Sequence, residues 1–265
     1  MQATIAAFDR VNLVGLGERH WSLEDSQFRL KLIRNPEFPQ KVDDIVIEFG
    51  NPRYQGVLDR FVDGDDVPYA EVSKVWLDTT QLRAWRSPVY EEFISAVRSV
   101  NASLPPGRRL RVVAGDYPID STPIPPINTG RQVPVINRDE AAAAVIRREV
   151  LDKNRKALVI FGAGHLYRND SRRLVYLVNQ DPRAKWFVVI PISAAAYPNA
   201  IARHAASSAK PVLLMATETV GNLDAADIGY AEKSNTTTVR QIADACLYFG
   251  SVSPLLLVGP SVPPR

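Results

Sequence analysis

The sequence has a single cysteine, Cys246, among its 265 residues. An intramolecular disulfide and any metal or iron–sulfur site built on several cysteines are therefore excluded. No apolar run approaches the roughly 20 residues that a membrane-spanning helix needs, so we expect no membrane span. The formal net charge is only +3, and the basic residues are interspersed with acidic ones. Because a nucleic-acid site usually leaves a basic stripe, we expect no nucleic-acid partner.

Residues 1–8 lack the charged segment and the apolar segment that make up a signal peptide. As the chain stands, this favours a cytoplasmic location. A secreted or periplasmic location is expected instead if a signal peptide was removed from a longer precursor. One cysteine fits either compartment, so the localisation stays open.

Several catalytic motifs are absent as well. There is no Gly-x-Ser-x-Gly sequence, which argues against a serine hydrolase of the usual α/β type. There is no Walker loop and no His-Glu-x-x-His helix. The segments 15–17 and 162–164 each begin a dinucleotide-binding fingerprint but lack its third glycine, so they are weak indications of a Rossmann cofactor site.

Short, nearly continuous apolar runs rich in β-branched residues alternate with helical patterns along the chain. The runs are residues 11–17, 44–50, 110–115, 157–162, 186–191 and 211–215. Helix starts are indicated at Ser22, Ser87-Pro88, Asn137, Ser171 and Thr238. The last of these helices is expected to end near Tyr248 and to place Cys246 in the core. The alternation predicts an α/β fold, a three-layer sandwich with a mostly parallel central sheet.

We expect residues 1–265 to form a single domain. Residues 51–105, between the second and third strands, are too many for one crossover and predict a helical insertion that covers the site as a lid. Residues 117–136 are rich in proline and predict a long loop, with a functional loop and a flexible linker as the two alternatives.

Polar residues follow four of the expected strands. They are Glu18 and His20 after the first strand, Glu48 at the end of the second, Asp116 after the third and His165 after the fourth. The carboxyl ends of parallel strands meet at one edge of the sheet, where open α/β proteins place their sites. Each residue alone has a structural explanation, such as a helix-terminal charge for Glu18 or a packed core histidine for His165. Together they predict a polar active site or metal site at that edge.

The chain has three histidines, and two of them belong to this set. The third, His204, lies in an alanine-rich stretch and is expected to be a surface residue.

The same residues resemble a known superfamily. The sequence Gly17-Glu18-Arg19-His20, the strand-terminal Glu48 and the Gly-x-Gly-His segment at 162–165 are similar to those of the superfamily that joins erythromycin esterases, ChaN-like haem-binding lipoproteins and Tiki/TraB proteins. The similarity runs in order from about residue 11 to 192, and the Gly-Glu-x-His spacing is closer to the ChaN-like form. The resemblance implies an α/β fold with a helical insertion and a site built from paired His and Glu side chains.

In the esterase branch, the resemblance implies that His20 activates water against an ester, with Glu18 beside it and with Glu48, Arg53 and His165 completing the site. The first hypothesis is therefore a hydrolase that acts on ester bonds of a small-molecule substrate and needs no cofactor. A neutral imidazole takes the proton from water, and a neighbouring carboxylate holds it in place. The residues expected to contact the substrate are Asp116 and two aromatic residues of the insertion, Trp76 and Trp85. Core packing is the alternative for the aromatic pair.

The second hypothesis is a binding protein. His20, Glu48 and His165 are the candidate ligands for a divalent metal or a haem iron held without turnover, as the ChaN-like branch implies. The Tiki-like branch implies a metal-dependent protease. The sequence leaves the choice between catalysis and binding open.

Overall fold

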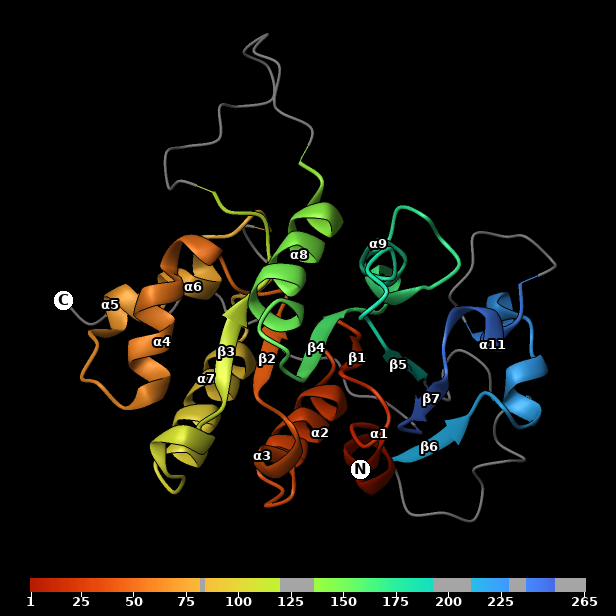
Figure 1. The fold of residues 1–265 in the computed structure, drawn as a ribbon, viewed down its shortest axis with the longest axis horizontal. Coiled ribbons are helices and arrows are strands. Elements are labelled where there is room, and N and C mark those ends of the chain that lie inside the picture. The colour runs from red at the N-terminus through yellow and green to blue at the C-terminus, as the bar shows by residue number, and fades with distance from the viewer. Residues whose placement is uncertain (82–83, 120–135, 193–210, 229–236, 251–265) are drawn as a thin grey trace, which may run out of the picture.

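The computed structural model describes residues 1–81, 84–119, 136–192, 211–228 and 237–250. Its centre is a seven-stranded sheet with the strand order β3-β2-β4-β1-β5-β7-β6 (Figure 1). The strands are β1 Leu13–Glu18, β2 Asp44–Ile47, β3 Arg111–Ala114, β4 Ala157–Gly162, β5 Trp186–Ile192, β6 Val212–Met215 and β7 Ala245–Tyr248. All neighbouring strands are parallel except β6, which runs antiparallel to β7 at one edge.

Helices cover both faces of this sheet. The α-helices are α1 Gln2–Ala7, α2 Leu23–Ile33, α3 Phe38–Lys41, α4 Gln55–Asp63, α5 Tyr69–Val72, α6 Lys74–Leu77, α7 Pro88–Asn101, α8 Arg138–Ile146, α9 Leu174–Val178 and α11 Val239–Ile242. Shorter helical turns are η1 Pro52–Tyr54, η2 Pro106–Arg108, η4 Ala163–Leu166, η5 Thr219–Asn222 and η6 Ala225–Ile228, and a π-helical turn, η3 Arg147–Leu151, continues α8.

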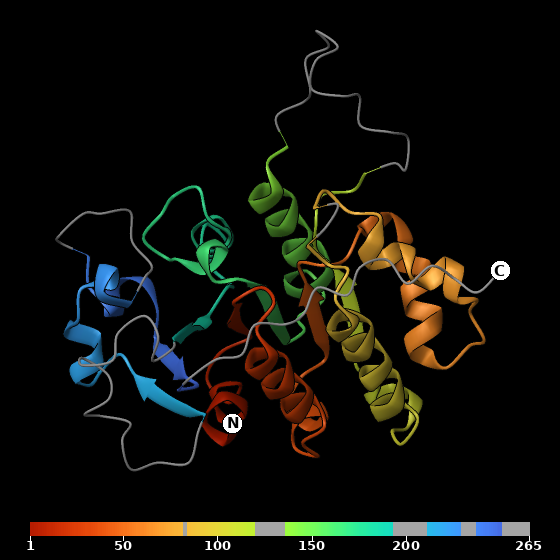
Figure 2. The same cartoon turned by 180° about the vertical axis from the view of Figure 1, so that it is seen from behind.

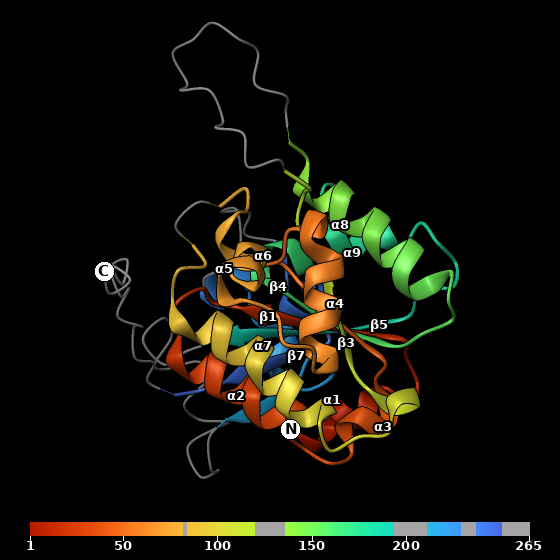
Figure 3. The same cartoon turned by 90° about the vertical axis from the view of Figure 1, so that its left-hand side faces the viewer.

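The side chains of the strands alternate between two apolar clusters. Ile45 and Ile47 of β2 belong to the cluster that contains α1, α2 and α7, whereas Val46 belongs to the cluster that contains α8, α9 and α11. Figure 3 shows α2 and α7 on one side of the sheet and α8 and α9 on the other. The predicted three-layer α/β sandwich with a mostly parallel sheet is confirmed.

The register of the central strands places the site. β1 lies between β4 and β5, so that Leu13 is opposite both Ala157 and Trp186. At the other end of the strand, Glu18 is opposite Gly162. The carboxyl ends of β1 and β4 are therefore level with each other.

The segment between β2 and β3 is mostly helical and contains α4 to α7. The helix α7 packs against α2 and α4, and α4 also packs against β3, so these helices extend one layer around the edge of the sheet (Figure 2). Buried side chains of the segment, among them Leu58 and Phe93, belong to the same apolar cluster as α2. Helix packing of this kind anchors the segment to the sheet.

The expected helix from Thr238 to Tyr248 is wrong in its second half. Thr238 and Gln241 form the capping box, but the helix ends at Ile242, and Ala243 is extended with φ −149° and ψ 167°. The next residues form β7, in which Cys246 is buried. A capping box specifies only where a helix starts, and this short apolar run fits between β5 and β6.

The start of one further helix differs from the sequence prediction, and two other predictions fall on residues that the structure does not describe. The helix expected from Ser171 begins at Leu174, with Arg173 as its N-cap residue. Most of the proline-rich loop, residues 120–135, and His204 lie outside the described residues. No helix in the described ranges is long and apolar enough to cross a membrane.

Candidate functional site

Glu18 ends β1 as a buried anion with fixed partners. Its Oε1 accepts a hydrogen bond from the Tyr90 hydroxyl at 2.7 Å, and its Oε2 forms an ion pair with the buried Arg29. Burial alone would raise the pKa of Glu18, but the charge of Arg29 and the contacts with His20 and Tyr90 lower it. Glu18 is therefore a carboxylate held in one orientation by the helices α2 and α7.

His20 lies two residues after Glu18, at the carboxyl edge of the sheet. Its Nδ1 is 3.5 Å from Glu18 Oε1 and its Nε2 is 3.9 Å from Glu48 Oε2, and 32% of the side chain is exposed. Burial opposes its protonation, but Glu18 and Glu48 outweigh burial and raise the pKa of His20. Trp85 packs edge-on against the ring at 4.9 Å between centroids.

The chain turns sharply directly after His20. Trp21 has a positive φ of 65°, a left-handed conformation that costs energy for a bulky residue. Its indole N–H donates to the Ala84 carbonyl at 2.9 Å, which ties the turn to the segment before α7. A strained turn held in this way orients His20 before any ligand binds.

Glu48 follows β2 and is the centre of the cluster. Its Oε2 accepts from the Gly162 backbone N–H at 2.5 Å, and its Oε1 lies 2.8 Å from Arg138 Nη2 and 3.4 Å from His165 Nε2. Burial favours the neutral acid, but the hydrogen bond and charge of His165, together with His20 and Arg138, lower the pKa of Glu48 to about 2. Glu48 therefore stays ionised across the physiological range.

His165 lies on η4, directly after β4, between two carboxylates. Its Nδ1 is 2.9 and 3.0 Å from the two oxygens of Asp139, and its Nε2 faces Glu48. Burial works against the charged ring, but Asp139 and Glu48 raise the pKa of His165 to about 9. At neutral pH the ring is an imidazolium, and both of its nitrogens are donors.

Arg138 joins two of the strand-end carboxylates. Its Nε donates to Asp116 Oδ1 at 2.7 Å while its Nη2 donates to Glu48, and Thr80 Oγ1 donates to the other oxygen of Asp116 at 2.8 Å. Asp116 is buried in this network behind the histidines. Arg53 lies at an exposed position of η1, and the guanidinium that pairs with Glu48 belongs to Arg138.

A glycine leaves room for this arrangement. A Cβ at Gly162 would lie 2.9 Å from His20 Nε2 and 3.3 Å from Glu48 Oε2. Only a residue without a side chain lets the imidazole approach the end of β4 so closely.

These residues border an open pocket of about 360 Å³ at the carboxyl edge of the sheet. It is lined by Glu18, Arg19, His20, Gly162, Ala163, Gly164, His165 and Arg173. The structure thus brings Glu18, His20, Glu48 and His165 together. Trp85 touches His20, whereas Trp76 is buried against Tyr69 in the helices beyond β2.

The sequence analysis missed Asp139, Arg138 and Arg29, and it did not connect Tyr90 with Glu18. Asp139 and Arg138 lie in the first turn of α8, the helix that follows β3. A helix that follows a strand in a parallel sheet begins near the carboxyl edge, so polar residues in its first turn were the available signal. Arg29 and Tyr90 lie within the helices α2 and α7, where no local pattern marks them.

The donor set does not fit a divalent metal. Within the described ranges no three His, Cys, Asp or Glu side chains are arranged to hold one. His165 lies between Asp139 and Glu48, and the two oxygens of Glu48 already accept hydrogen bonds from Arg138 and the Gly162 N–H, so a metal would have to displace these partners. Nε2 of His20, which lies 3.9 Å from Glu48 on a side chain that is 32% exposed, would be the nitrogen that faces a haem iron.

No family model and no curated protein matches the sequence. The fold is similar to a protein from Bacillus cereus, with a TM-score of 0.58 and 10% identity over 96% of this chain and 92% of that one. ChaN of Campylobacter jejuni, whose structure is described as cofacial haem binding, gives a TM-score of 0.48 and 14% identity over 94% and 91%. The C-terminal region of Pasteurella multocida toxin, described as having a thiol-protease-like triad, gives 0.47 and 12% over 71% and 24%.

At these identities the likeness concerns the fold alone, and the similarity to the Bacillus cereus protein extends over nearly the whole of both chains. The α/β fold implied by the resemblance is confirmed.

Proposed function

We propose that this chain is a hydrolase that uses His20 as a general base to activate water against an ester bond of a small molecule. The observation that carries the proposal is the pairing of His20 Nδ1 with a carboxylate, Glu18, that Arg29 and Tyr90 hold in place. At 3.5 Å the pair is an ion-pair contact and not a hydrogen bond. A carboxylate on this side of the ring favours the tautomer with the proton on Nδ1 and the lone pair on Nε2, which is the form that a general base requires.

In the proposed reaction, Nε2 of neutral His20 takes a proton from water as the water oxygen attacks the ester carbonyl carbon. Glu18 stabilises the imidazolium that forms. The tetrahedral intermediate then breaks its bond to the leaving oxygen, and His20 returns the proton to that oxygen. The products are a carboxylic acid and an alcohol, and no covalent enzyme intermediate is needed.

His165 is the proposed donor to the developing oxyanion. Its Nδ1 is tied closely to Asp139, whereas its Nε2 contact to Glu48 is longer, at 3.4 Å. Glu48 keeps Arg138 and the Gly162 N–H when that contact is exchanged for the substrate. One preorganised donor of this kind is worth about 3–4 kcal/mol in the transition state.

The two histidines predict a bell-shaped pH profile of kcat/KM. His20 must be neutral to accept a proton, so the ascending limb follows its pKa, which its carboxylates raise above the ordinary value of about 6.5. His165 must be protonated to donate, so activity falls as the pH passes about 9. A profile that rises steadily to pH 11 would contradict the role of His165.

The test is a hydrolysis screen over lactones, acyl esters and peptides, with and without a chelator. We expect ester cleavage that the chelator does not affect. His20→Asn should abolish turnover with an unchanged melting temperature, and His165→Gln should leave a residual rate. Glu140→Gln, an exposed change in the first turn of α8, is the matched control.

Full activity of both histidine variants would overturn the proposal. The alternatives have their own signatures in the same experiment. A Soret band in the purified protein without hydrolysis favours a ChaN-like haem-binding role, and chelator-sensitive peptide cleavage favours a Tiki-like protease.

A further inference from the structure

We infer that the pocket beside His20 takes an anionic small molecule, one that carries a carboxylate or phosphate group, and that Arg173 binds this group. The hydrolysis of this molecule after binding rests on the proposed function. The binding of the anion can be tested separately.

The ionised side chains that line the pocket are mostly cations. Arg19, Arg173 and the imidazolium of His165 face it, and Glu18 is the carboxylate among the lining residues. Glu18 is already neutralised by its ion pair with Arg29 from behind the pocket. A hollow bordered in this way attracts anions and disfavours cations.

Arg173 is the cation with the weakest internal partners. Its Nη1 is 3.9 Å from Asp139 and its Nε is 3.3 Å from Asp170, and the buried Nε atom makes no hydrogen bond within the described structure. Both carboxylates are engaged elsewhere, because Asp139 binds His165 and Asp170 accepts two side-chain hydrogen bonds at 3.0 Å from Arg172. With 36% of its side chain exposed, Arg173 presents donors to the pocket.

Arg19 has a different part in the same pocket. Its Nη2 is bound to Asp25 at 2.9 Å, and its guanidinium lies over the Phe249 ring at 5.4 Å from the centroid. Its Nε and Nη1 are buried without an acceptor among the described residues. Arg19 therefore adds positive potential to the pocket from a fixed position.

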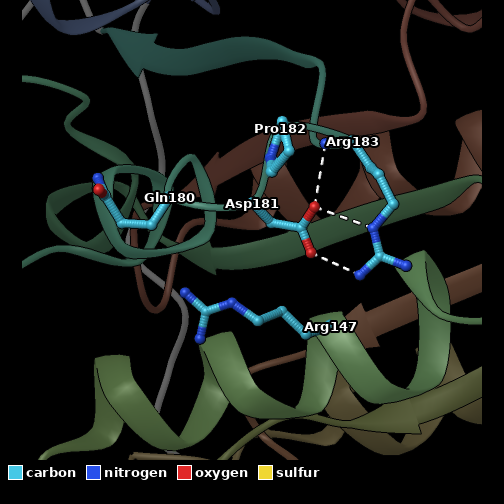
Figure 4. A pocket seen from close by; sticks show the side chains of 5 residues that line it. All are labelled: Arg147, Gln180, Asp181, Pro182 and Arg183. Carbon is cyan, nitrogen blue, oxygen red and sulfur yellow. Dashed lines mark hydrogen bonds and ion pairs between the residues drawn. The ribbon is translucent and has the colours of Figure 1, made fainter.

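A larger hollow of about 470 Å³ at the opposite edge of the sheet lacks such a free donor. Figure 4 shows Asp181 engaging Arg183 through two side-chain contacts and one backbone N–H. Arg183 also binds Asp152, and Arg147 donates to the Leu177 carbonyl. Both arginines of that hollow already donate hydrogen bonds to acceptors of the protein.

The size of the pocket and the shape of the guanidinium define the ligand class. A volume of about 360 Å³ is at the small end for ligand sites, so the ligand is a compact molecule. A guanidinium forms two parallel hydrogen bonds with a carboxylate or phosphate, which a neutral group does not reproduce. The proposed substrate is therefore a small ester with an oxyanion group near the scissile bond.

The test uses glutarate and phenyl phosphate as separate probes in calorimetric titrations with the purified protein. We expect at least one of them to bind, and Arg173→Gln to weaken it about tenfold or more, since the lost contact is charge-assisted. Arg34→Gln removes an exposed arginine at the end of α2, which is not among the pocket-lining residues, and should leave the affinity within about twofold. Glutarate binding alone assigns a carboxylate, and phenyl phosphate binding alone assigns a phosphate.

Rates on p-nitrophenyl hemiglutarate and p-nitrophenyl valerate separate this inference from the proposed function. We expect a higher kcat/KM for the anionic p-nitrophenyl hemiglutarate than for the neutral p-nitrophenyl valerate, and we expect Arg173→Gln to remove this difference. If the anions bind but neither ester is cleaved, the hydrolase proposal fails and the anion site stands. If neither probe binds, or if Arg173→Gln and Arg34→Gln behave alike, the anion site is refuted even when neutral esters are cleaved.

Discussion

Replacing Asp139 by Asn tests what keeps His165 protonated. The substitution keeps the shape of the side chain and an oxygen for the Leu174 backbone N–H, which donates to Asp139 at 2.9 Å. It removes the negative charge 2.9 Å from His165 Nδ1. Glu48, at the longer distance of 3.4 Å, then remains as the nearest anion.

The size of the expected fall in the His165 pKa follows from its two carboxylate partners, Asp139 and Glu48. Together they raise the pKa of His165 from its ordinary value of 6.5 to about 9. Because the Asp139 contact is the shorter one, we assign it half to three-quarters of the effect, a drop of roughly 1–2 pKa units on substitution. That drop equals about 1.4–2.7 kcal/mol of differential stabilisation between the charged and neutral rings.

The same interaction gives a stability signature of definite sign. A folded-state pKa above the unfolded one adds stability that is full below about pH 6.5 and is lost as the pH rises through about 9. Asp139→Asn should therefore lower the free energy of unfolding most at pH 6 and little at pH 10. Urea unfolding at both pH values measures this difference.

The direct measurement is an NMR titration of the His165 ring. Glu140→Gln, which neutralises the next acidic residue of α8 at an exposed position, should leave the His165 pKa within a few tenths of a unit. If Asp139→Asn leaves that pKa unchanged as well, the assignment of Asp139 as the anchoring carboxylate is refuted.

Three further outcomes are expected. Gly162→Ala should lower kcat about 100-fold with little change in melting temperature, because its Cβ would displace the partly exposed His20 ring, whereas Gly164→Ala, whose Cβ meets no atom within 4 Å, should lose far less. Glu18→Gln should cost about 3–5 kcal/mol in urea unfolding because it leaves Arg29 buried and unpaired, and a loss below about 1 kcal/mol would contradict this. Dialysis against EDTA should leave the melting temperature unchanged, since the carboxylates are held by cations of the protein, and a fall would reveal a structural metal.

The sequence predicted the central strands well because they are short apolar runs buried on both faces. β1 and β4, with all their residues buried, are the clearest cases, and both are followed by glycine-rich polar segments. The seventh strand was missed because residues 245–248 follow a genuine capping box at Thr238. Local signals fix where a helix begins, and packing against β5 and β6 decides how far it continues.

The strand-end rule brought Glu18, His20, Glu48 and His165 together because parallel strands share one carboxyl edge. The rule does not predict which residues pair with these side chains and shift their pKa values. Those partners come from helices on both sides of the sheet, Arg29 from α2 and Asp139 from α8. Their pairing depends on helix rotation and packing, which the order of residues along the chain does not display.

This difference in partners separates two histidines that look alike in the sequence. His20 shares its nearest carboxylate, Glu18, with Arg29 and Tyr90, and it remains partly open to solvent. His165 lies between two carboxylates, which raise its pKa to about 9. The charge on His165 in turn opposes protonation of His20, which lowers the pKa of His20 relative to what its carboxylates alone would give. Two histidines at one site with different carboxylate partners are suited to divide the roles of acid and base.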